Sequence, residues 1–283
     1  MIELADNRYG KSAIRLVKVV RGEERHIVRD LTIAIALDGD FGAAHTDGDN
    51  SGVVATDTMK NTAYAFAKDH LDGAIEAYGR ALAEHFIDFP QVEHARVTVR
   101  EHHWEPLATP TGRAAAAFVR DPSFTRLAVV SANAGDVTIE AGIEDLALMK
   151  TAGSAFSGFP RDRYTTLPET EDRIMATQVS ARWRYRSPEL DAGVDHDTLF
   201  EAVLGTLLEV FAAHDSPSVQ ASIWIVGRAI LERHSELQEI FFSLPNLHHL
   251  LVDLAPFGLE NDNEVFVATG EPHGLIEATI RRS

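Results

Sequence analysis

The sequence contains no cysteine among its 283 residues. This absence excludes disulfide frameworks, zinc sites with thiolate ligands, iron-sulfur clusters and a cysteine nucleophile. No apolar run approaches the roughly 18 residues that a membrane-spanning helix needs. The first residues, Met1 to Asp6, lack the basic start and apolar segment of a secretory signal peptide. We therefore expect a cytoplasmic protein whose chemistry does not use thiols.

Positive charge is also scarce, with 26 Lys and Arg against 43 Asp and Glu, which gives a net charge of -17. A surface this acidic repels phosphate backbones and anionic lipids, so the charge disfavours nucleic-acid and membrane-surface binding. The apolar fraction of 45% and the charged fraction of 24% are those of a folded globular chain. The length allows one large domain or two of ordinary size.

The common cofactor and metal motifs are absent as well. There is no G-x-G-x-x-G or Walker loop, no G-x-S-x-G elbow and no H-E-x-x-H. Histidines do occur as adjacent pairs, at His102–His103 and His248–His249. Because neighbouring strand residues face opposite sides of a sheet, neither pair is suited to hold one metal ion. One histidine remains available as a proton carrier near neutral pH.

The first half of the chain alternates between strand-like and helix-like patterns. The β-rich runs are 13–20, 26–36, 95–100 and 114–119. A turn at 21–24 joins the first two runs as a hairpin, and apolar residues spaced three and four apart after Met59 predict one or two amphipathic helices. This half therefore reads as hairpin, helices, hairpin.

The cluster Asp121-Pro122-Ser123 is rich in strand-breaking residues and is the expected boundary between two domains. After it a second hairpin is predicted, with strands 127–130 and 137–143 around the turn residues 133–136. Thr166-Leu167-Pro168-Glu169 fits a capping box, which predicts a helix after Thr166.

The remaining elements complete the repeat. An apolar stripe predicts a helix over 197–213, and Ser216-Pro217 is a start signal for another. Strands are expected over 239–254, broken at Pro245, and over 264–268 paired with 275–280. Two copies of strands, helices and strands predict an antiparallel α+β fold with helices on one sheet face, in domains 1–122 and 123–283. Because open sheets leave unpaired edges, we expect the sheets to continue across subunits into closed barrels.

Several polar residues could belong to a binding site, although each has a structural alternative. Thr56, Asp57 and Thr58 lie at an expected helix start, which either is simply capped or binds an anion through free backbone N–H groups. Lys11 by itself would be a solvated surface lysine. Arg173 falls about two turns into the helix expected after Thr166, beside three carboxylates, where a surface ion pair is usual. The alternative role for Arg173 is a fork of donors that grips a planar carbonyl edge.

Gln220 and Phe156 likewise each have two alternative interpretations, one structural and one functional. Gln220 lies near a helix start, where its carboxamide could present a donor and an acceptor, or could merely be exposed. Phe156 lies in a loop of small residues, where its ring could be a core anchor or a stacking platform.

An ordered set of short strings resembles segments of the urate oxidases. These strings are Tyr9-Gly10-Lys11, Val54 to Thr62, Gly158 to Leu167, Asp172-Arg173-Ile174, Ala181-Arg182-Trp183, Ser218-Val219-Gln220, Ser243-Leu244-Pro245-Asn246 and Gly274 to Ile280. The resemblance extends from about Asn7 to Arg281, which is essentially the whole chain.

The resemblance implies a tunnelling fold with two such domains per subunit, and a homotetramer whose barrels enclose a tunnel. It implies the oxidation of urate by O2 and water to 5-hydroxyisourate and hydrogen peroxide. It also implies that neither a metal nor an organic cofactor takes part.

The resemblance further implies roles for individual residues. Phe156 would stack on the purine, Arg173 and Gln220 would clamp its polar edge, and the backbone of Val219 would add a contact. Asn246 would hold O2 and later water above the ring.

The remaining site residues would come from a neighbouring subunit. Thr56 and Asp57 would approach the substrate together with Lys11, so that active sites form only at subunit interfaces. Lys11, Thr56 and His248 would form a proton relay.

Two features depart from the family pattern. Leu247 stands where a lysine is common, but on a strand it should point away from Asn246 and His248. The last residues, Arg281-Arg282-Ser283, lack the peroxisomal Ser-Lys-Leu type of signal, which favours a bacterial-style cytoplasmic enzyme. The alternatives are a catalytically silent purine-binding protein of the same fold, and a pterin-type cyclohydrolase, whose metal site would lack a cysteine here.

Overall fold

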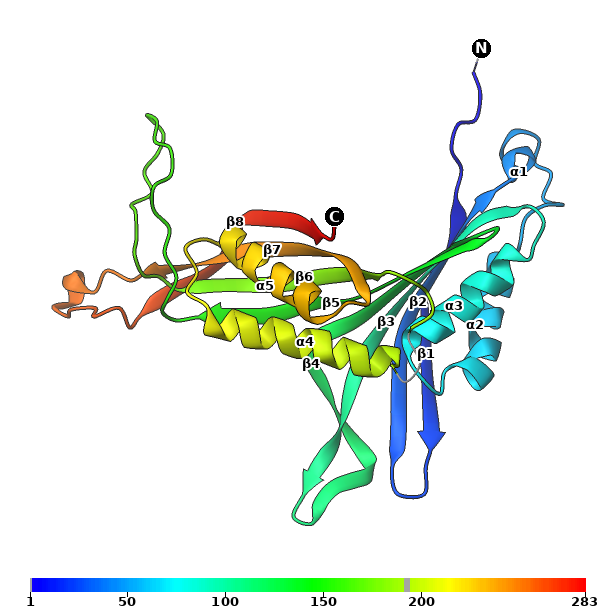
Figure 1. Ribbon diagram of the computed structural model, residues 1–283, viewed down its shortest axis with the longest axis horizontal. Coiled ribbons are helices and arrows are strands. Elements are labelled where there is room, and N and C mark those ends of the chain that lie inside the picture. The colour runs from blue at the N-terminus through cyan, green and yellow to red at the C-terminus, as the bar shows by residue number, and fades with distance from the viewer. Residues whose placement is uncertain (1, 191–193) are drawn as a thin grey trace. The chain divides into compact units, whose positions relative to one another are not determined.

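The computed structural model describes residues 2–190 and 194–283. Its strands form an eight-stranded sheet in which each strand lies beside the next one along the chain (Figure 1). The strands are β1 (Tyr9–Arg21), β2 (His26–Gly39), β3 (Val92–Thr109), β4 (Gly112–Asn133), β5 (Asp136–Lys150), β6 (Met175–Tyr185), β7 (Leu237–Leu251) and β8 (Phe266–Arg281). The helices are α1 (Gly42–Thr46), α2 (Thr56–His70), α3 (Ile75–Ile87), α4 (His196–Ala213), α5 (Val219–Arg233) and the 3-10 turn η1 (Ala255–Phe257). The predicted antiparallel α+β architecture is confirmed.

The chain divides into two compact units. Unit 1 comprises residues 1–143 and 183–200, and unit 2 comprises residues 144–182 and 201–283. The boundary expected between residues 122 and 123 lies inside β4. As a division into two repeated halves, 1–122 and 123–283 remains a prediction.

The breaker cluster at Asp121-Pro122-Ser123 does not end a strand, contrary to expectation. The ladder between β3 and β4 shifts register here, because His102 pairs with Thr125 whereas Trp104 pairs with Arg120. The Asp121 carboxylate accepts a hydrogen bond from the backbone N–H of Ser123 at 2.9 Å. Residues that break a ladder therefore produce a local irregularity within one long strand.

The helix expected after Thr166 is also wrong, since residues 157–169 form an irregular loop. The Glu169 carboxylate, which a capping box would turn back to Thr166, instead accepts from the backbone N–H of Gly158 at 3.2 Å. No apolar stripe follows the capping residues, so a helix here would have no face to bury. Arg173 consequently lies in the irregular segment just before β6.

The last two strands also differ from expectation. β7 passes unbroken through Pro245, which pairs with Leu275 close to a register shift between Asn246 and His248. Near such an irregular stretch of ladder the missing N–H of a proline is tolerated. The runs 264–268 and 275–280 do not pair with each other. Residues 266–268 of the first run and all of the second belong to the single strand β8, and both pair with β7.

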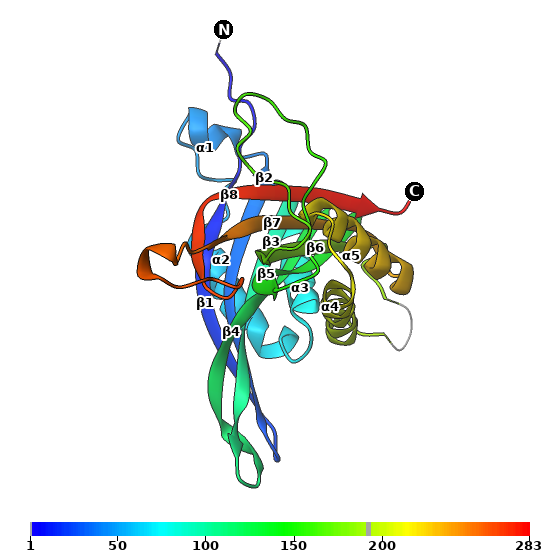
Figure 2. The same ribbon diagram turned by 90° about the vertical axis from the view of Figure 1, so that its left-hand side faces the viewer.

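In unit 1, α2 and α3 cover one face of the strands, while the far ends of the β1–β2 and β3–β4 hairpins extend beyond the helices (Figure 2). The buried Tyr78 hydroxyl of α3 donates to the Ala63 carbonyl of α2 at 2.7 Å. Gly79 lets α3 approach the sheet, because a Cβ there would lie 3.0 Å from Val130 Cγ2. These contacts fix where α2 begins above β1.

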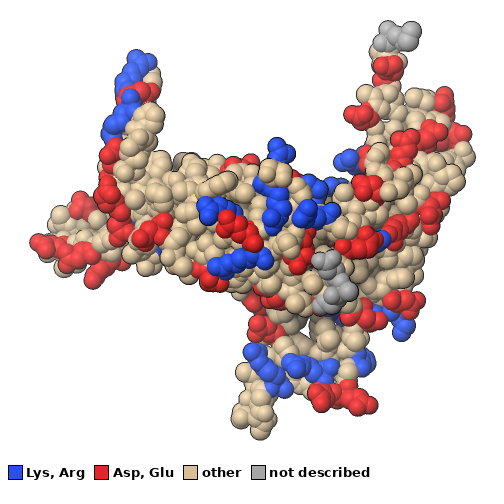
Figure 3. Space-filling model, in the orientation of Figure 1, with Lys and Arg blue, Asp and Glu red and all other residues tan. Residues whose placement is uncertain are grey.

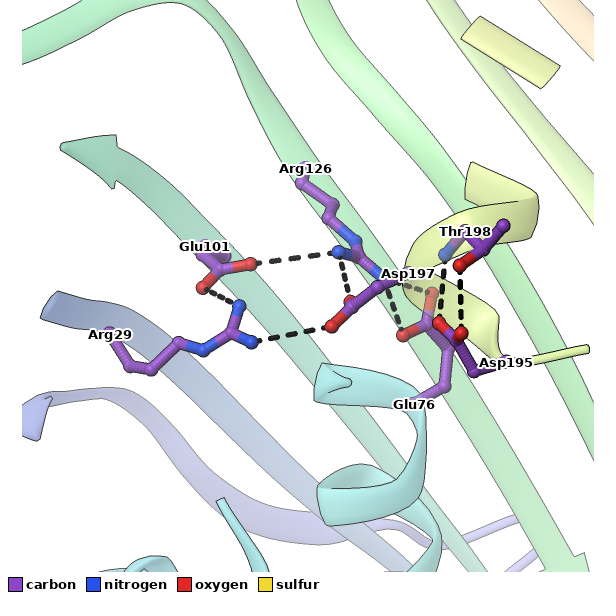
Figure 4. A network of polar contacts seen from close by, with 7 residues as sticks. All are labelled: Arg29, Glu76, Glu101, Arg126, Asp195, Asp197 and Thr198. Atoms are coloured by element: carbon purple, nitrogen blue, oxygen red, sulfur yellow. Dashed lines mark hydrogen bonds and ion pairs between the residues drawn. The ribbon is translucent and has the colours of Figure 1, made fainter. Parts of the chain in front are cut away.

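Unit 1 also contains a network of charged side chains, most of them buried (Figure 4). Arg126 on β4 bonds to Glu76 of α3 at 2.8 Å and to Asp197 of α4 at 2.6 Å, and Arg29 on β2 bonds to Glu101 on β3 at 2.8 Å. Glu76 is fully buried. Burial by itself would lower the pKa of Arg126, but the charges of Glu76, Asp197 and Glu101 raise it above its usual value. The network therefore connects three strands with two helices through charges that stabilise one another.

In unit 2, α5 packs against β7 and β8. Gly227 permits this packing, because a Cβ there would meet Ile280 Cδ1 at 2.8 Å and Phe242 Cε2 at 3.2 Å. Ser222, closer to the start of α5, lines a cavity of about 20 Å³ together with Leu244. The start of α5 therefore lies toward the second half of β7. Among the helices of residues 2–190 and 194–283, none is long and apolar enough to cross a membrane.

Candidate functional site

In unit 1 the structure brings Lys11 of β1 close to the first turn of α2. The Tyr9 hydroxyl donates to the Val54 carbonyl at 3.0 Å, which holds the start of β1 beside the segment that leads into α2. The pKa of Asp57 is lowered chiefly by the hydrogen bond and charge of Lys60 and to a smaller extent by the charge of Lys11. Lys11 therefore lies within electrostatic range of the Asp57 carboxylate at the start of α2.

The start of α2 differs in detail from a helix capped by a polar side chain. Thr56 is the first helical residue, and the N-cap is Ala55, which makes no side-chain hydrogen bond. The Asp57 carboxylate is taken up by Lys60 and by Asn61, whose Nδ2 donates to it at 2.9 Å. The first backbone N–H groups of α2 are thus left without a side-chain cap, beside the Thr56 hydroxyl.

In unit 2 the Phe156 loop is held in place by its backbone. Phe156 and Thr170 exchange hydrogen bonds of 2.8 and 3.0 Å. The Phe156 ring stacks on the ring of Phe159, with centroids 5.0 Å apart and planes 15° apart, and the guanidinium carbon of Arg173 lies 5.3 Å from the Phe156 centroid. The sequence did not single out Phe159 by itself, although it belongs to the matching string that begins at Gly158.

Arg173 does not form the surface ion pair that its sequence neighbours suggested. The Asp172 carboxylate accepts from the backbone N–H of Gly153 at 2.8 Å, and that of Glu169 from Gly158. Arg173 Nε is buried without a hydrogen-bond partner in the described part of the chain. Burial lowers the pKa of the guanidinium, which nevertheless keeps its charge at any physiological pH.

Val219 and Gln220 are the first two residues of α5. The helix begins two residues later than predicted, because Ser218 rather than Ser216 is the cap and accepts from the Ala221 N–H at 3.1 Å. Ser216 instead bridges to the Phe156 loop, where its carbonyl accepts from Ala155 and its N–H donates to Gly153, both at 2.8 Å. The start of α5 is thereby fixed beside Phe156.

Asn246 and His248 lie on β7, just beyond Leu244 and toward the start of α5. Leu247 and His249 line a separate cavity of about 370 Å³, which neither Asn246 nor His248 lines. This agrees with the expected alternation, in which Leu247 points away from both of its neighbours.

The expected site residues share one property. Apart from Asp57, the polar ones have no side-chain hydrogen bond or ion pair to any residue in 2–190 or 194–283; they are Lys11, Thr56, Arg173, Gln220, Asn246 and His248. All except the exposed Gln220 are partly buried. Partly buried polar groups that the protein leaves unpaired are typical of a site that binds a ligand.

Among residues 2–190 and 194–283 there is no group of three His, Cys, Asp or Glu side chains suited to hold a metal ion. Positive charge occurs near Phe156 despite the acidic total. Arg161 lies over the Phe159 ring at 5.6 Å, and basic side chains are visible on the loop between β5 and β6 (Figure 3). This local charge favours a planar anion over a cation.

Comparisons with known proteins identify the family of this chain. The Uricase family profile matches residues 7–131 and 139–277. The uricase of Arthrobacter globiformis is 48% identical over 282 residues, which cover 99% of this chain and 90% of that protein. The uricase of Dictyostelium discoideum is 38% identical and covers 100% of this chain and 99% of its own length. The crystal structure of the Arthrobacter globiformis uricase matches with a TM-score of 0.92, over 100% of this chain and 96% of that one. The chain therefore belongs to the uricase family.

Proposed function

We propose that this urate oxidase converts urate, O2 and water to 5-hydroxyisourate and hydrogen peroxide without a metal or organic cofactor. One observation carries the assignment to these residues. Apart from Asp57, the polar side chains that the family resemblance marks as the site have no side-chain hydrogen bond or ion pair with residues 2–190 and 194–283. Urate is a flat anion with N–H and C=O groups along its edges. These groups can form the hydrogen bonds that the unpartnered side chains lack.

Most contacts with urate would come from unit 2, while Thr56 and Asp57 of unit 1 would also approach the substrate. Arg173 would donate in a fork to the carbonyl edge of urate, while the Gln220 carboxamide and the Val219 N–H would complete the pattern of donors and acceptors. Because Phe159 already covers one face of the Phe156 ring, the purine would stack on the other face. Stacking holds the ring flat without neutralising its charge, so the guanidinium provides the main electrostatic contribution.

Catalysis then depends on proton transfer from and to the bound substrate. Urate itself is the reductant, and a second deprotonation makes it electron-rich enough to pass an electron to O2. Lys11 and Thr56 at the start of α2, with His248, would take up and return the protons, and Asn246 would hold O2 and then water above the ring. The free N–H groups at the start of α2 favour the negative charge that builds up.

Unit 1 contains Lys11, Thr56 and Asp57, whereas unit 2 contains Phe156, Arg173, Val219, Gln220, Asn246 and His248. We propose that the two sets meet across subunit interfaces of a homotetramer, so that each site draws on two chains. The cytoplasmic location expected from the sequence remains a prediction.

The reaction is tested by incubating chelator-treated protein with urate and oxygen while urate absorbance and peroxide are followed. We expect urate to disappear, with one peroxide formed for each urate. A metal analysis of the same sample is the control. If urate binds but is not consumed, the chain is the catalytically silent purine-binding protein. Activity that returns only when a metal is restored would contradict the cofactor-free mechanism.

Sharing of the site between chains predicts complementation. Thr56→Ala and Arg173→Ala should each be nearly inactive alone, because one lacks the relay and the other the anion clamp. After subunit exchange, mixed oligomers contain some sites with neither change, so about a quarter of the wild-type activity should return if exchange is random and each site uses two chains. Exchange is verified by mass spectrometry of differently tagged chains. No recovery despite complete exchange would place both residues in a site built by one chain.

A further inference from the structure

A chain of buried hydrogen bonds lies behind the start of α5. His214 Nδ1 is 2.8 Å from the Val210 carbonyl at the end of α4, and its Nε2 is 2.8 Å from Ser222 Oγ on α5. Ser222 Oγ is in turn 2.8 Å from Ser216 Oγ. Both serines are almost fully buried. These three side chains join the end of α4, the connecting loop and the second turn of α5.

The partner of His214 Nδ1 decides where a hydrogen of the ring lies. The Val210 carbonyl can only accept, so the hydrogen of the ring must be on Nδ1. Ser222 Oγ lies within hydrogen-bond distance of both Nε2 and Ser216 Oγ, and the Ser216 hydroxyl donates to the Ser218 carbonyl at 3.1 Å. Every side chain in this series has a hydrogen-bond partner, so the loss of one is costly to the others.

The series of hydrogen bonds from His214 through Ser222 to Ser216 ends next to residues that would hold urate. The backbone of Ser216 bonds to Gly153 and Ala155, immediately before Phe156. Two residues after Ser216 comes the cap Ser218, whose carbonyl lies 3.1 Å from Ser216 Oγ, and then Val219 and Gln220. None of the three chain members is itself placed to touch the purine. Their position connects the Phe156 loop to the start of α5, which carries Val219 and Gln220.

We propose that His214, Ser222 and Ser216 are positioning residues of the urate site. They hold the first turn of α5 at a set distance from the Phe156 ring, so that the Val219 N–H and the Gln220 carboxamide meet the edge of a stacked purine. This inference rests on the proposed function. A clamp of fixed donors loses much of its value when its support allows it to shift by about 0.5–1 Å.

The test uses His214→Phe, which keeps a flat ring but removes both nitrogens, and Ser222→Ala, which interrupts the chain in the middle. Each should raise the KM for urate, and the dissociation constant of urate measured without oxygen, by about tenfold. The turnover number should stay within about threefold, because contacts made equally with bound urate and the transition state change KM rather than kcat. The double variant should be no worse than either single one, since both break the same chain. His214→Gln can place an acceptor near the position of Nε2 and should recover most of the affinity.

The same pair of helices supplies a matched control. His234 Nε2 is 2.9 Å from Thr206 Oγ1, so a second histidine–hydroxyl bond joins α4 to the far end of α5. His234→Phe should lower the melting temperature about as much as His214→Phe does, with the KM for urate unchanged. The His234→Phe control therefore distinguishes a general loss of stability from a loss of alignment at the urate site.

The outcomes can be told apart. If the wild-type protein does not oxidise urate, the proposed function fails and this inference fails with it. If the wild-type protein is active and His214→Phe matches His234→Phe in both KM and melting temperature, the chain is only structural and the positioning role is wrong. Equal loss of kcat in His214→Phe and His214→Gln would likewise contradict a role in binding alignment.

Discussion

Replacing Lys11 with methionine is expected to lower the turnover number by about 10²- to 10⁴-fold, the range typical of a lost general acid or base. Methionine keeps the length and much of the volume of the side chain but cannot carry a proton. Lys11 is proposed to move protons and is not among the residues proposed to bind urate, so the dissociation constant of urate measured without oxygen should change by less than about threefold. The measurements are initial rates of urate loss and anaerobic titration of the same preparation.

Lys18→Met is the matched control for this prediction, because it makes the same chemical change on the same strand. The Lys18 ammonium donates to the Lys68 carbonyl at 2.9 Å and pairs with Asp72 at 2.8 Å, both at the far end of α2. Its turnover should equal that of the wild type. If Lys11→Met keeps more than about a third of the wild-type rate, Lys11 is not a member of the proton relay.

Replacing Glu76 with glutamine is expected to reduce the free energy of unfolding by about 3–5 kcal/mol, the usual cost of removing one partner from a buried ion pair. Glu76 is fully buried and binds Arg126 Nη2 through both carboxylate oxygens, at 3.1 and 2.8 Å. Glutamine keeps the shape but leaves Arg126 with one fewer counter-charge. Thermal melting at fixed protein concentration and urea titration with two spectroscopic probes would measure the change.

Two further variants define the cause of this loss. Glu209→Gln breaks an exposed pair with Arg233, and its melting temperature should stay within experimental error of the wild type. In the double variant Glu76→Met, Arg126→Met both charges are replaced by apolar side chains, so much of the lost stability should return. If Glu76→Gln melts like the wild type, the network of Figure 4 contributes little to stability.

The elements predicted correctly from the sequence are those with strong periodicity. The hairpin at 21–24, the helices after Met59 and the helix over 197–213 all have apolar faces that bury against the sheet, and burial dominates the choice of secondary structure. Errors arose where the prediction relied on a local signal instead. Asp121 to Ser123, Thr166 to Glu169 and Pro245 are breaker or capping residues, but their long-range pairing partners decide whether a strand continues.

The site could be predicted only in part for a related reason. Single residues such as Arg173 and Gln220 have no periodic signal, and their roles came from the resemblance to urate oxidases. Proximity in space was not predictable from spacing, as the closeness of Lys11 to Asp57 and of Ser216 to the Phe156 loop shows. The hydrogen bonds that link His214, Ser222 and Ser216 depend on the directions of these side chains, which the sequence alone does not give.

Every strand of the sheet lies beside the strand made just before or just after it. As the polypeptide leaves the ribosome, each new strand therefore has one neighbouring strand that is already synthesised, whereas unit 1 is complete only after residues 183–200 are made. Pairings between close segments also form faster than pairings between distant ones, because shorter loops lose less entropy on closing. The nascent protein can therefore build its sheet in the order of translation, and a stalled ribosome would carry a partly built sheet rather than an unfolded chain.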